Sequence, residues 1–177
     1  MTTDPRIELV KSQIRDVPNF PKPGILFKDI TPLLAHPKAF NASLDLLGER
    51  LQDLEADTVV GMESRGFIFG AALAAKMHLP FVPARKPGKL PAETVKVEYA
   101  LEYGKDALEM HVDALHEGAR VLIVDDLVAT GGTAKATAEL VEKLGGTVAG
   151  FAFVVELGFL EGAHELAPHP VHSLVRY

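Results

Sequence analysis

The sequence predicts an α/β fold with a mainly parallel central sheet flanked by helices. Short apolar runs recur along the chain, and most are followed by a segment with helical periodicity. Polar or glycine-rich turns separate several of these runs from the helices that follow them. In a sheet of this kind ligands bind outside the carboxyl ends of the strands, so the residues after each run are the first candidates for a functional site.

The elements are expected in the following order. A short helix over residues 5–16, with Asp4 as its N-terminal cap, precedes a turn-rich loop at 17–24 that has three prolines and a glycine. Leucines and a phenylalanine spaced by three and four predict an amphipathic helix over residues 37–55. Further along, the patterns predict strands at 58–62, 81–85, 120–124 and 148–157, helices at 66–78 and 132–144, a hairpin or mobile flap at 95–112, and a C-terminal edge strand at 172–177.

The composition limits the classes of function. The 177 residues fit one domain of ordinary size, and 47% of them are hydrophobic, which is enough for a sizeable core. The formal net charge of −6 argues against a broad nucleic-acid surface, because such a surface normally needs a basic excess. Cysteine is absent, which excludes disulfides, thiolate zinc sites and cysteine nucleophiles. Apolar stretches long enough for a signal peptide or a membrane span are also absent, so we expect a soluble, cytoplasmic protein with no membrane partner.

A ligand site is expected where the strand at 120–124 ends. Two carboxylates, Asp125 and Asp126, follow this strand, and a glycine turn comes next, made of Ala129, Thr130, Gly131, Gly132 and Thr133. Backbone N–H groups in such a turn, together with the N-terminus of the next helix, form an anion site that suits a phosphate monoester. Carboxylates accept hydrogen bonds from vicinal hydroxyls, so the combination suggests a ribose 5-phosphate. A capped strand-to-helix turn, a surface acidic pair and a magnesium site remain alternatives at this point.

Two cationic groups follow other predicted strands. Arg65 stands in the turn Glu63–Gly66 after the strand at 58–62, and it suits a pyrophosphate group. A cationic cluster on the proline-bearing loop after the strand at 81–85 is made of Arg85, Lys86 and Lys89. Either group alone is more often a solvated surface charge. Because the carboxyl ends of parallel strands meet at one edge of a sheet, we expect both groups and the acid pair to line a single crevice.

The stretch VLIVDDLVATGGT, residues 121–133, resembles the phosphoribosyl pyrophosphate signature of type I phosphoribosyltransferases. The segments NFPKPGILFKDITPLL, ESRGFIFG, ARKPGKLP and YALEYG are similar to adenine-specific members of that family, and the resemblance runs from Ile14 to Glu156. It implies a single phosphoribosyltransferase domain over residues 1–177, with a small base-reading hood segment at 1–35 and a flexible flap at 95–112. The implied activity is a step of purine salvage, in which the 5-phosphoribosyl group of phosphoribosyl pyrophosphate passes to adenine, giving AMP and pyrophosphate.

The same resemblance implies a role for each group of site residues. Glu102 is the catalytic carboxylate, and the acid pair and the glycine turn bind the ribose hydroxyls and the 5-phosphate. The residues implied for pyrophosphate are Ser64, Arg65, Arg85, Lys86 and Lys89, and those implied for adenine are Leu26, Phe27, Lys28 and Leu127. A cis peptide bond is expected near Glu63-Ser64.

Cofactor, partners and rival functions follow from the same reading. Mg²⁺ is expected to arrive with phosphoribosyl pyrophosphate, because the histidines have no metal-ligand spacing that indicates a dedicated protein site. The chain is expected to form a homodimer and to act on small molecules. The alternatives are a phosphoribosyltransferase for another purine, which the FPKPGILFKDI segment argues against, and a non-catalytic regulator that binds phosphoribosyl pyrophosphate. The length, the acidic balance and the presence of Glu102 argue against the regulator.

Overall fold

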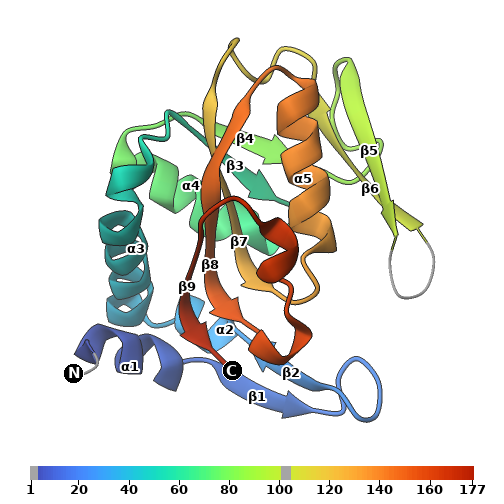
Figure 1. Ribbon diagram of the computed structural model, residues 1–177. Coiled ribbons are helices and arrows are strands. Elements are labelled where there is room, and N and C mark those ends of the chain that lie inside the picture. The colour runs from blue at the N-terminus through green and yellow to red at the C-terminus, as the bar shows by residue number, and fades with distance from the viewer. Residues whose placement is uncertain (1–3, 101–104) are drawn as a thin grey trace. The chain divides into compact units, whose positions relative to one another are not determined.

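The computed structural model describes residues 4–100 and 105–177 (Figure 1). It divides into two compact units, Met1–Leu46 and Leu47–Tyr177. The first unit contains α1 (Pro5–Ser12), β1 (Arg15–Pro18), β2 (Leu26–Asp29), α2 (Thr31–Leu34) and most of α3 (Pro37–Leu51). The second contains η1 (Gln52–Leu54), β3 (Thr58–Met62), α4 (Arg65–Met77), β4 (Phe81–Ala84), β5 (Thr94–Ala100), β6 (Lys105–His111), β7 (Arg120–Val128), α5 (Gly132–Lys143), β8 (Thr147–Glu156), η2 (Gly158–Leu160), η3 (His164–Leu166) and β9 (Val171–Arg176).

The first unit contains an antiparallel hairpin, β1–β2, that the sequence patterns did not predict. Two ion pairs cross the hairpin. Nη2 of Arg15 lies 2.5 Å from Oδ2 of Asp29, and Nζ of Lys28 lies 2.6 Å from Oδ1 of Asp16. Each of these ion pairs joins two residues that are also partners in the strand register. The predicted helix to residue 16 is therefore too long, because Arg15 and Asp16 belong to the hairpin.

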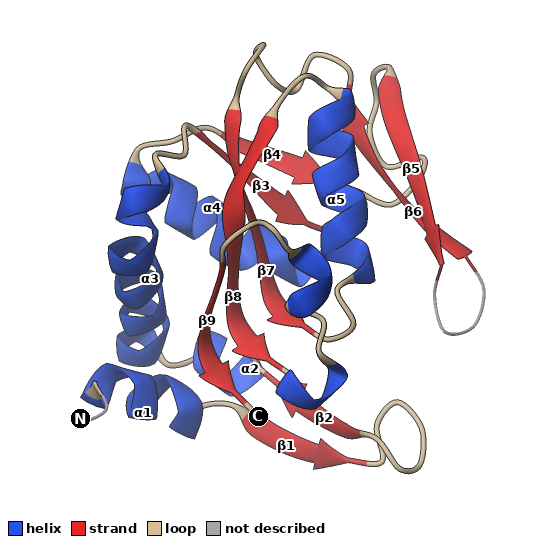
Figure 2. Ribbon diagram, viewed as in Figure 1, coloured by secondary structure: helices blue, strands red, loops and turns tan. Residues whose placement is uncertain are grey.

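The second unit is built on a five-stranded parallel sheet in the order β4-β3-β7-β8-β9. From β3 the chain crosses to β4 through α4, and from β7 it crosses in the opposite direction to β8 through α5. Right-handed crossovers in opposite directions place the two helices on opposite faces, and Figures 1 and 2 show α5 in front of the sheet and α4 behind it. The α/β prediction with a mainly parallel sheet is thus confirmed, and β9 is the edge strand that was expected.

The central strands have the composition of strands that are covered on both faces. All five residues of β3 are buried, and so are the four apolar residues Val121–Val124 of β7. Such strands read as continuous apolar runs rather than as alternating patterns, which is why the sequence predicts them well. Strand β7, however, continues to Val128 instead of ending at residue 124. Asp125 and Asp126 therefore lie inside the strand, in a segment that pairs with β8.

A separate two-stranded sheet is formed by β5 and β6, which confirms the hairpin among the alternatives for residues 95–112. The hairpin contacts α5, and its strand β6 also pairs with the end of β4 through Arg85 and Glu109. Two backbone hydrogen bonds of 2.9 and 2.7 Å join these two residues. The segment at 101–104, which includes Glu102, lies outside the described residues.

Candidate functional site

A cavity of about 200 Å³ lies in the second unit at the carboxyl ends of β3 and β7. These neighbouring strands send their crossovers in opposite directions, so the chain topology itself leaves a crevice between them. The lining comes from the end of β3, the start of α4, the end of β7 and the turn into α5, with residues Met62, Arg65, Asp125, Leu127, Val128, Ala129, Thr130, Gly131, Gly132, Thr133, Ala134 and Phe153. A cavity of this size suits a small phosphorylated ligand.

One wall of the cavity is the phosphate loop, Ala129–Thr133, which follows β7 and includes the first two residues of α5. Gly131 has φ +82°, a conformation that L side chains rarely adopt, and it stands directly before the first residue of the helix. The first turn of a helix leaves backbone N–H groups without intrahelical partners, and the helix dipole makes this end positive. Helix α5 has no side-chain cap and no acidic residue in its first turn, so among its described residues no carboxylate competes with an anion there.

The acid pair consists of two carboxylates with different surroundings. Asp125 lines the cavity, and its Oδ1 accepts a hydrogen bond of 2.8 Å from the Asp126 backbone N–H. Burial and the neighbouring Asp126 carboxylate raise the pKa of Asp125 well above its ordinary value. The side chain of Asp126 is 2% exposed, and its Oδ2 lies 3.1 Å from Nε of Arg65. Within the described part of the chain this buried oxygen accepts no hydrogen bond, and Asp125, not Asp126, is the acid that lines the cavity.

Helix α4 approaches the acid pair closely because residue 66 is a glycine. A Cβ atom at Gly66 would lie 2.8 Å from the Val124 carbonyl oxygen and 2.9 Å from Oδ1 of Asp125. The close approach brings the start of α4, with the Arg65 guanidinium, to the strand that carries both acids. The turn before α4 contains the expected cis peptide bond between Glu63 and Ser64. The side chain of Ser64 caps no backbone group of the helix.

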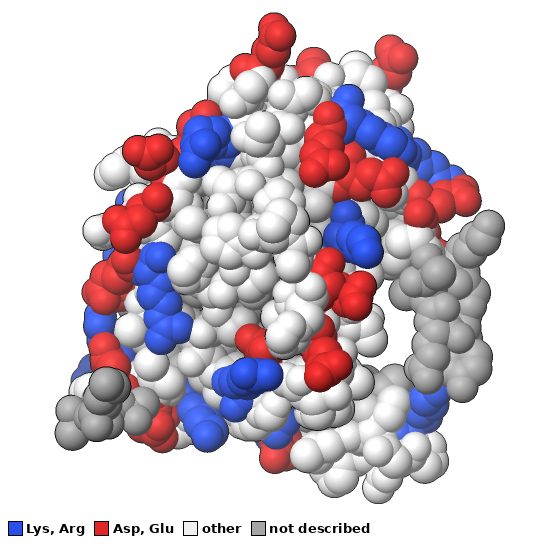
Figure 3. Space-filling view, viewed as in Figure 1, with Lys and Arg blue, Asp and Glu red and all other residues white. Residues whose placement is uncertain are grey.

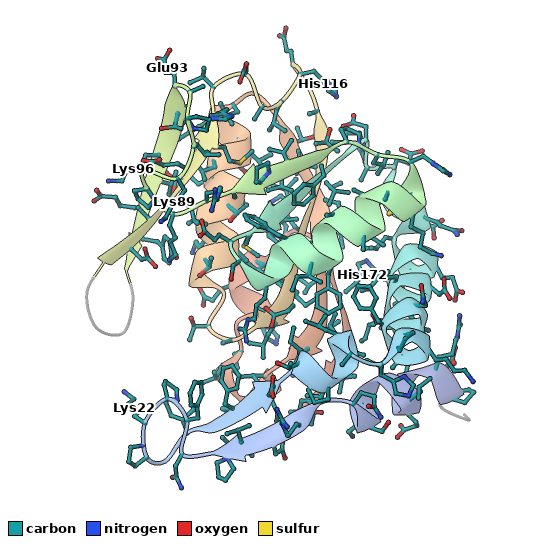
Figure 4. The ribbon with its side chains drawn as sticks, turned by 180° about the vertical axis from the view of Figure 1, so that it is seen from behind. Lys22, Lys89, Glu93, Lys96, His116 and His172 are labelled. Atoms are coloured by element: carbon teal, nitrogen blue, oxygen red, sulfur yellow. The ribbon has the colours of Figure 1, made fainter. Side chains whose placement is uncertain are left out.

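Glu63 organises the basic loop, residues Arg85–Lys89. Its Oε2 accepts hydrogen bonds from the Lys86 backbone N–H at 2.9 Å and from Arg85 Nε at 3.2 Å. Burial alone raises the pKa of Glu63, but these hydrogen bonds outweigh burial and leave the pKa below the ordinary value. Lys89 is exposed on the same loop, between β4 and β5, as Figure 4 shows from behind. The loop is therefore anchored on a carboxylate at the end of β3, next to the cavity.

The second unit brings many of the predicted site residues together. Asp125, the phosphate loop, Leu127 and Arg65 meet at the cavity, and Asp126 pairs with Arg65 beside it. Glu63 ties the basic loop to the end of β3. The residues expected to contact a base, Leu26–Lys28, belong to β2 in the first unit. There Phe27 packs edge-on against Phe20 with ring centroids 5.1 Å apart, and the side chain of Lys28 is 8% exposed. Glu102 is outside the described residues.

Three polar residues contact the basic loop, namely Glu63, Tyr99 and Asp106. The sequence placed Glu63 in the turn at the expected crevice and Tyr99 in the expected flap, but it predicted no contact of either with the basic loop and gave no role to Asp106. Each contacts Arg85 or Lys86, which are 13 to 23 residues away in sequence. Glu63 had a visible signal, because it directly follows a buried strand at the edge where ligands bind. The contacts of Tyr99 and Asp106 with Lys86 had no such signal, because they join two strands of a hairpin to a loop that is distant in sequence.

Comparisons with known proteins agree on one family. Residues 29–168 match the model of the phosphoribosyl transferase domain family. An adenine phosphoribosyltransferase of Sorangium cellulosum is 61% identical over 176 residues, which cover 97% of this chain and 88% of that protein. The crystal structure of adenine phosphoribosyltransferase from Thermoanaerobacter pseudethanolicus is 53% identical, with a TM-score of 0.94 over 97% of this chain and 99% of that one. The Saccharomyces cerevisiae enzyme, crystallised with an iminoaltritol bisphosphate and adenine, is 42% identical, with a TM-score of 0.91 over 97% of this chain and 99% of that one.

Proposed function

This chain belongs to the adenine phosphoribosyltransferase family, and from that premise we propose that it transfers the 5-phosphoribosyl group of phosphoribosyl pyrophosphate to adenine. The products are AMP and pyrophosphate, and the reaction salvages a purine base. The observation that carries the proposal is the cavity at the ends of β3 and β7, where a phosphate loop and an acid pair lie together. The loop suits the 5-phosphate, and the carboxylates suit the hydroxyls of the attached ribose.

Each wall of the site takes a part of the substrate in this proposal. The phosphate loop Ala129–Thr133 binds the 5-phosphate, and Asp125 and Asp126 bind the ribose hydroxyls. Pyrophosphate binds to Ser64, Arg65, Arg85, Lys86 and Lys89, and adenine binds to Leu26, Phe27, Lys28 and Leu127. Residues 1–35 form the base-reading segment and residues 95–112 the flap. Charge supports these roles. Arg65 and the basic loop are cationic and suit the pyrophosphate anion, whereas the two carboxylates suit the uncharged hydroxyls of ribose.

The proposed chemistry is the displacement of pyrophosphate from the anomeric carbon by N9 of adenine. As pyrophosphate leaves, the sugar gains positive charge and the leaving group gains negative charge. Arg65 and the basic loop stabilise the leaving group. A carboxylate from Glu102 stabilises the positive sugar or handles the proton of the adenine ring. Mg²⁺ would arrive with the pyrophosphate substrate and supply a counter-charge to it, and the described residues contain no cluster of three or more metal-ligating side chains that would hold the ion separately.

Base choice tests the proposed function directly. Adenine should be converted to AMP, whereas hypoxanthine and guanine should have kcat/KM values lower by at least about a hundredfold, because backbone groups placed for an exocyclic amine are left unpaired by a carbonyl. The measurement is initial-rate kinetics with each base at saturating phosphoribosyl pyrophosphate. Turnover of guanine or hypoxanthine at a rate comparable to adenine would assign the chain to another purine. Binding of phosphoribosyl pyrophosphate without turnover of any base would favour a regulator.

Small molecules are the partners in this proposal. On the face drawn in Figure 3, acidic and basic side chains of the described residues are interspersed and form no continuous basic stripe. This face therefore does not suit a nucleic-acid backbone, which requires an extended basic surface. In the part of the chain that the structure describes, no helix is both long enough and apolar enough to cross a membrane.

We propose that the active form is a homodimer whose interface includes α4 next to the basic loop. Ile68 on this helix is 41% exposed, and its neighbour Phe67 lies 5.9 Å below the Arg85 guanidinium. A two-fold dimer is the commonest closed assembly. Ile68→Glu should therefore raise the dimer dissociation constant by at least about tenfold, because it introduces a charge into a desolvated contact. Light scattering over a dilution series measures this, and Phe159→Glu, at an apolar residue that is 72% exposed, is the matched control. An Ile68→Glu protein that remains as dimeric as the control would exclude this interface.

A further inference from the structure

The ammonium group of Lys86 is held by two side chains of the β5–β6 hairpin. Its Nζ forms an ion pair with Oδ2 of Asp106 on β6 and lies 3.4 Å from the hydroxyl of Tyr99 on β5. The Tyr99 hydroxyl also donates a hydrogen bond of 3.2 Å to the same Asp106 oxygen. The three groups therefore form a closed triangle in which one carboxylate oxygen accepts from both of the others.

The triangle lies next to the phosphate loop. Oγ1 of Thr133, the last residue of that loop, donates a hydrogen bond of 3.4 Å to the Tyr99 hydroxyl. The ammonium of Lys86 is thus separated from the loop by a single side chain. Its backbone is anchored independently, because its N–H donates to Glu63 at the end of β3. The lysine side chain can therefore change its partner while its backbone stays in place.

Asp106 also compensates the charge of Lys86. Burial by itself lowers the pKa of Lys86, but the hydrogen bond to Asp106, with a contribution from Tyr99, raises the pKa above its ordinary value. The same hydrogen bond lowers the pKa of Asp106. Both groups are consequently charged near neutral pH, and an ammonium that is already neutralised attracts a polyanion less than an unpaired one does.

We propose that Asp106 is a positioning residue that competes with pyrophosphate for the Lys86 ammonium. This inference rests on the proposed function, in which Lys86 binds the pyrophosphate group. Pairing with Asp106 and contact with pyrophosphate are alternatives for the lysine, so binding of the polyanion replaces one carboxylate partner by a phosphate. The Asp106 carboxylate lowers the affinity of the enzyme for pyrophosphate, and Lys86 pairs with Asp106 again when this product leaves.

Competition fits the charges better than a shared arrangement does. An ammonium has three donors and could in geometry bridge a carboxylate and a phosphate. Pyrophosphate carries several negative charges, however, and a carboxylate on the same ammonium would lie within a few ångströms of them and repel them. Asp106 has a second attachment, the hydrogen bond from Tyr99, and therefore keeps its position when Lys86 moves away.

The test is the affinity of the full chain for pyrophosphate in the presence of Mg²⁺, measured by calorimetry. Asp106→Asn keeps the size of the side chain and an acceptor oxygen but removes the competing charge. We expect the dissociation constant of pyrophosphate to fall by about tenfold, which corresponds to the weakening of one charge pair near a protein surface. The affinity for ribose 5-phosphate, which lacks the pyrophosphate group, should stay within about twofold. In steady-state assays, product inhibition by pyrophosphate should become stronger while inhibition by AMP does not.

Glu98→Gln is the matched control, because it removes the same charge from the same hairpin. Glu98 pairs with Lys96 at 3.1 Å, with exposed fractions of 58% and 45%. Figure 4 shows Lys96 at the outer edge of the hairpin. This variant should bind pyrophosphate like the wild type. Equal tightening in both variants would show a general charge effect and overturn the proposal.

Weaker or unchanged pyrophosphate binding in Asp106→Asn would also overturn the proposal, since it would show that Asp106 only supports the fold or the lysine geometry. Asp106→Thr, which keeps a side chain suited to a strand, provides a second variant if the asparagine protein is poorly folded. The two levels of inference fail differently. A wild type that converts adenine, together with an asparagine variant that binds no tighter, removes the role of Asp106 alone. A wild type that binds no pyrophosphate removes the proposed function as well.

Discussion

Replacement of both Asp125 and Asp126 by asparagine should weaken the binding of phosphoribosyl pyrophosphate by between about a hundredfold and about ten-thousandfold. The reason is the loss of charge-assisted hydrogen bonds from two ribose hydroxyls, each of which contributes roughly 1.5–3 kcal/mol. Asp125 lines the cavity, and Asp126 has a buried oxygen that accepts no hydrogen bond within the described part of the chain. Calorimetry with phosphoribosyl pyrophosphate measures the loss directly. Asp113→Asn, which changes an exposed acid, is the control and should bind normally.

The two single variants should differ in stability, and the difference provides a check on the folded state. The pKa of Asp125 is raised in the native protein, so the native state keeps its proton to a higher pH than the unfolded chain does. The contribution of Asp125 to the free energy of unfolding is complete below the pKa of the unfolded chain, about 3.9, and is lost as pH rises through the native pKa. Asp125→Asn, which is always neutral, should therefore gain stability relative to the wild type as pH rises. Urea denaturation at a series of pH values measures this trend.

Asp126→Asn should instead lower the free energy of unfolding at neutral pH, because it removes the buried partner of the Arg65 guanidinium. A folded double variant with wild-type affinity would exclude the acid pair from the sugar site. Equal pH dependence of stability in Asp125→Asn and the wild type would instead show that Asp125 is not the group that holds the proton.

The parts of the fold that sequence predicts well are those specified by local patterns. Strands β3 and β7 are covered on both faces, so their apolar runs stand out, and glycines mark the start and end of α5. The β1–β2 hairpin is different, because its strands have four residues each and are specified by ion pairs across the hairpin. A charged residue such as Lys28 gives no sign along the chain that its side chain is buried.

The candidate site divides in the same way. A short motif contains both the acid pair and the phosphate loop, because one strand and the turn after it supply them. The anchoring of the basic loop depends on side chains from three strand ends, and no spacing rule relates Glu63 or Asp106 to Lys86. The end of β7 was also misjudged, since two carboxylates suggested that the strand stops at residue 124. The strand instead continues through both acids, because it pairs with β8 up to Val128.

Glu102→Leu should lower kcat by roughly 10²–10⁴-fold and leave substrate binding nearly unchanged, if this carboxylate acts only as the reacting centre gains positive charge. Glu102 stands in sequence between β5 and β6, the hairpin that contacts α5 and supplies Tyr99 to the phosphate loop. The measurement is the single-turnover rate with enzyme in excess, because product release can mask the chemical step. Glu98→Gln, on the same hairpin, is the control for a general loss of negative charge and should react at the wild-type rate.

Glu102→Gln separates the two roles that a carboxylate can have in this reaction. The amide keeps the size and most of the hydrogen-bonding capacity of the side chain but removes its charge. If charge stabilisation of the sugar dominates, the glutamine variant should be nearly as slow as the leucine variant, because an amide dipole replaces little of a full negative charge. If a hydrogen bond that positions the adenine ring dominates, glutamine should retain much more activity than leucine. A leucine variant with a wild-type single-turnover rate would remove Glu102 from the mechanism and leave the cations around pyrophosphate as the main source of transition-state stabilisation.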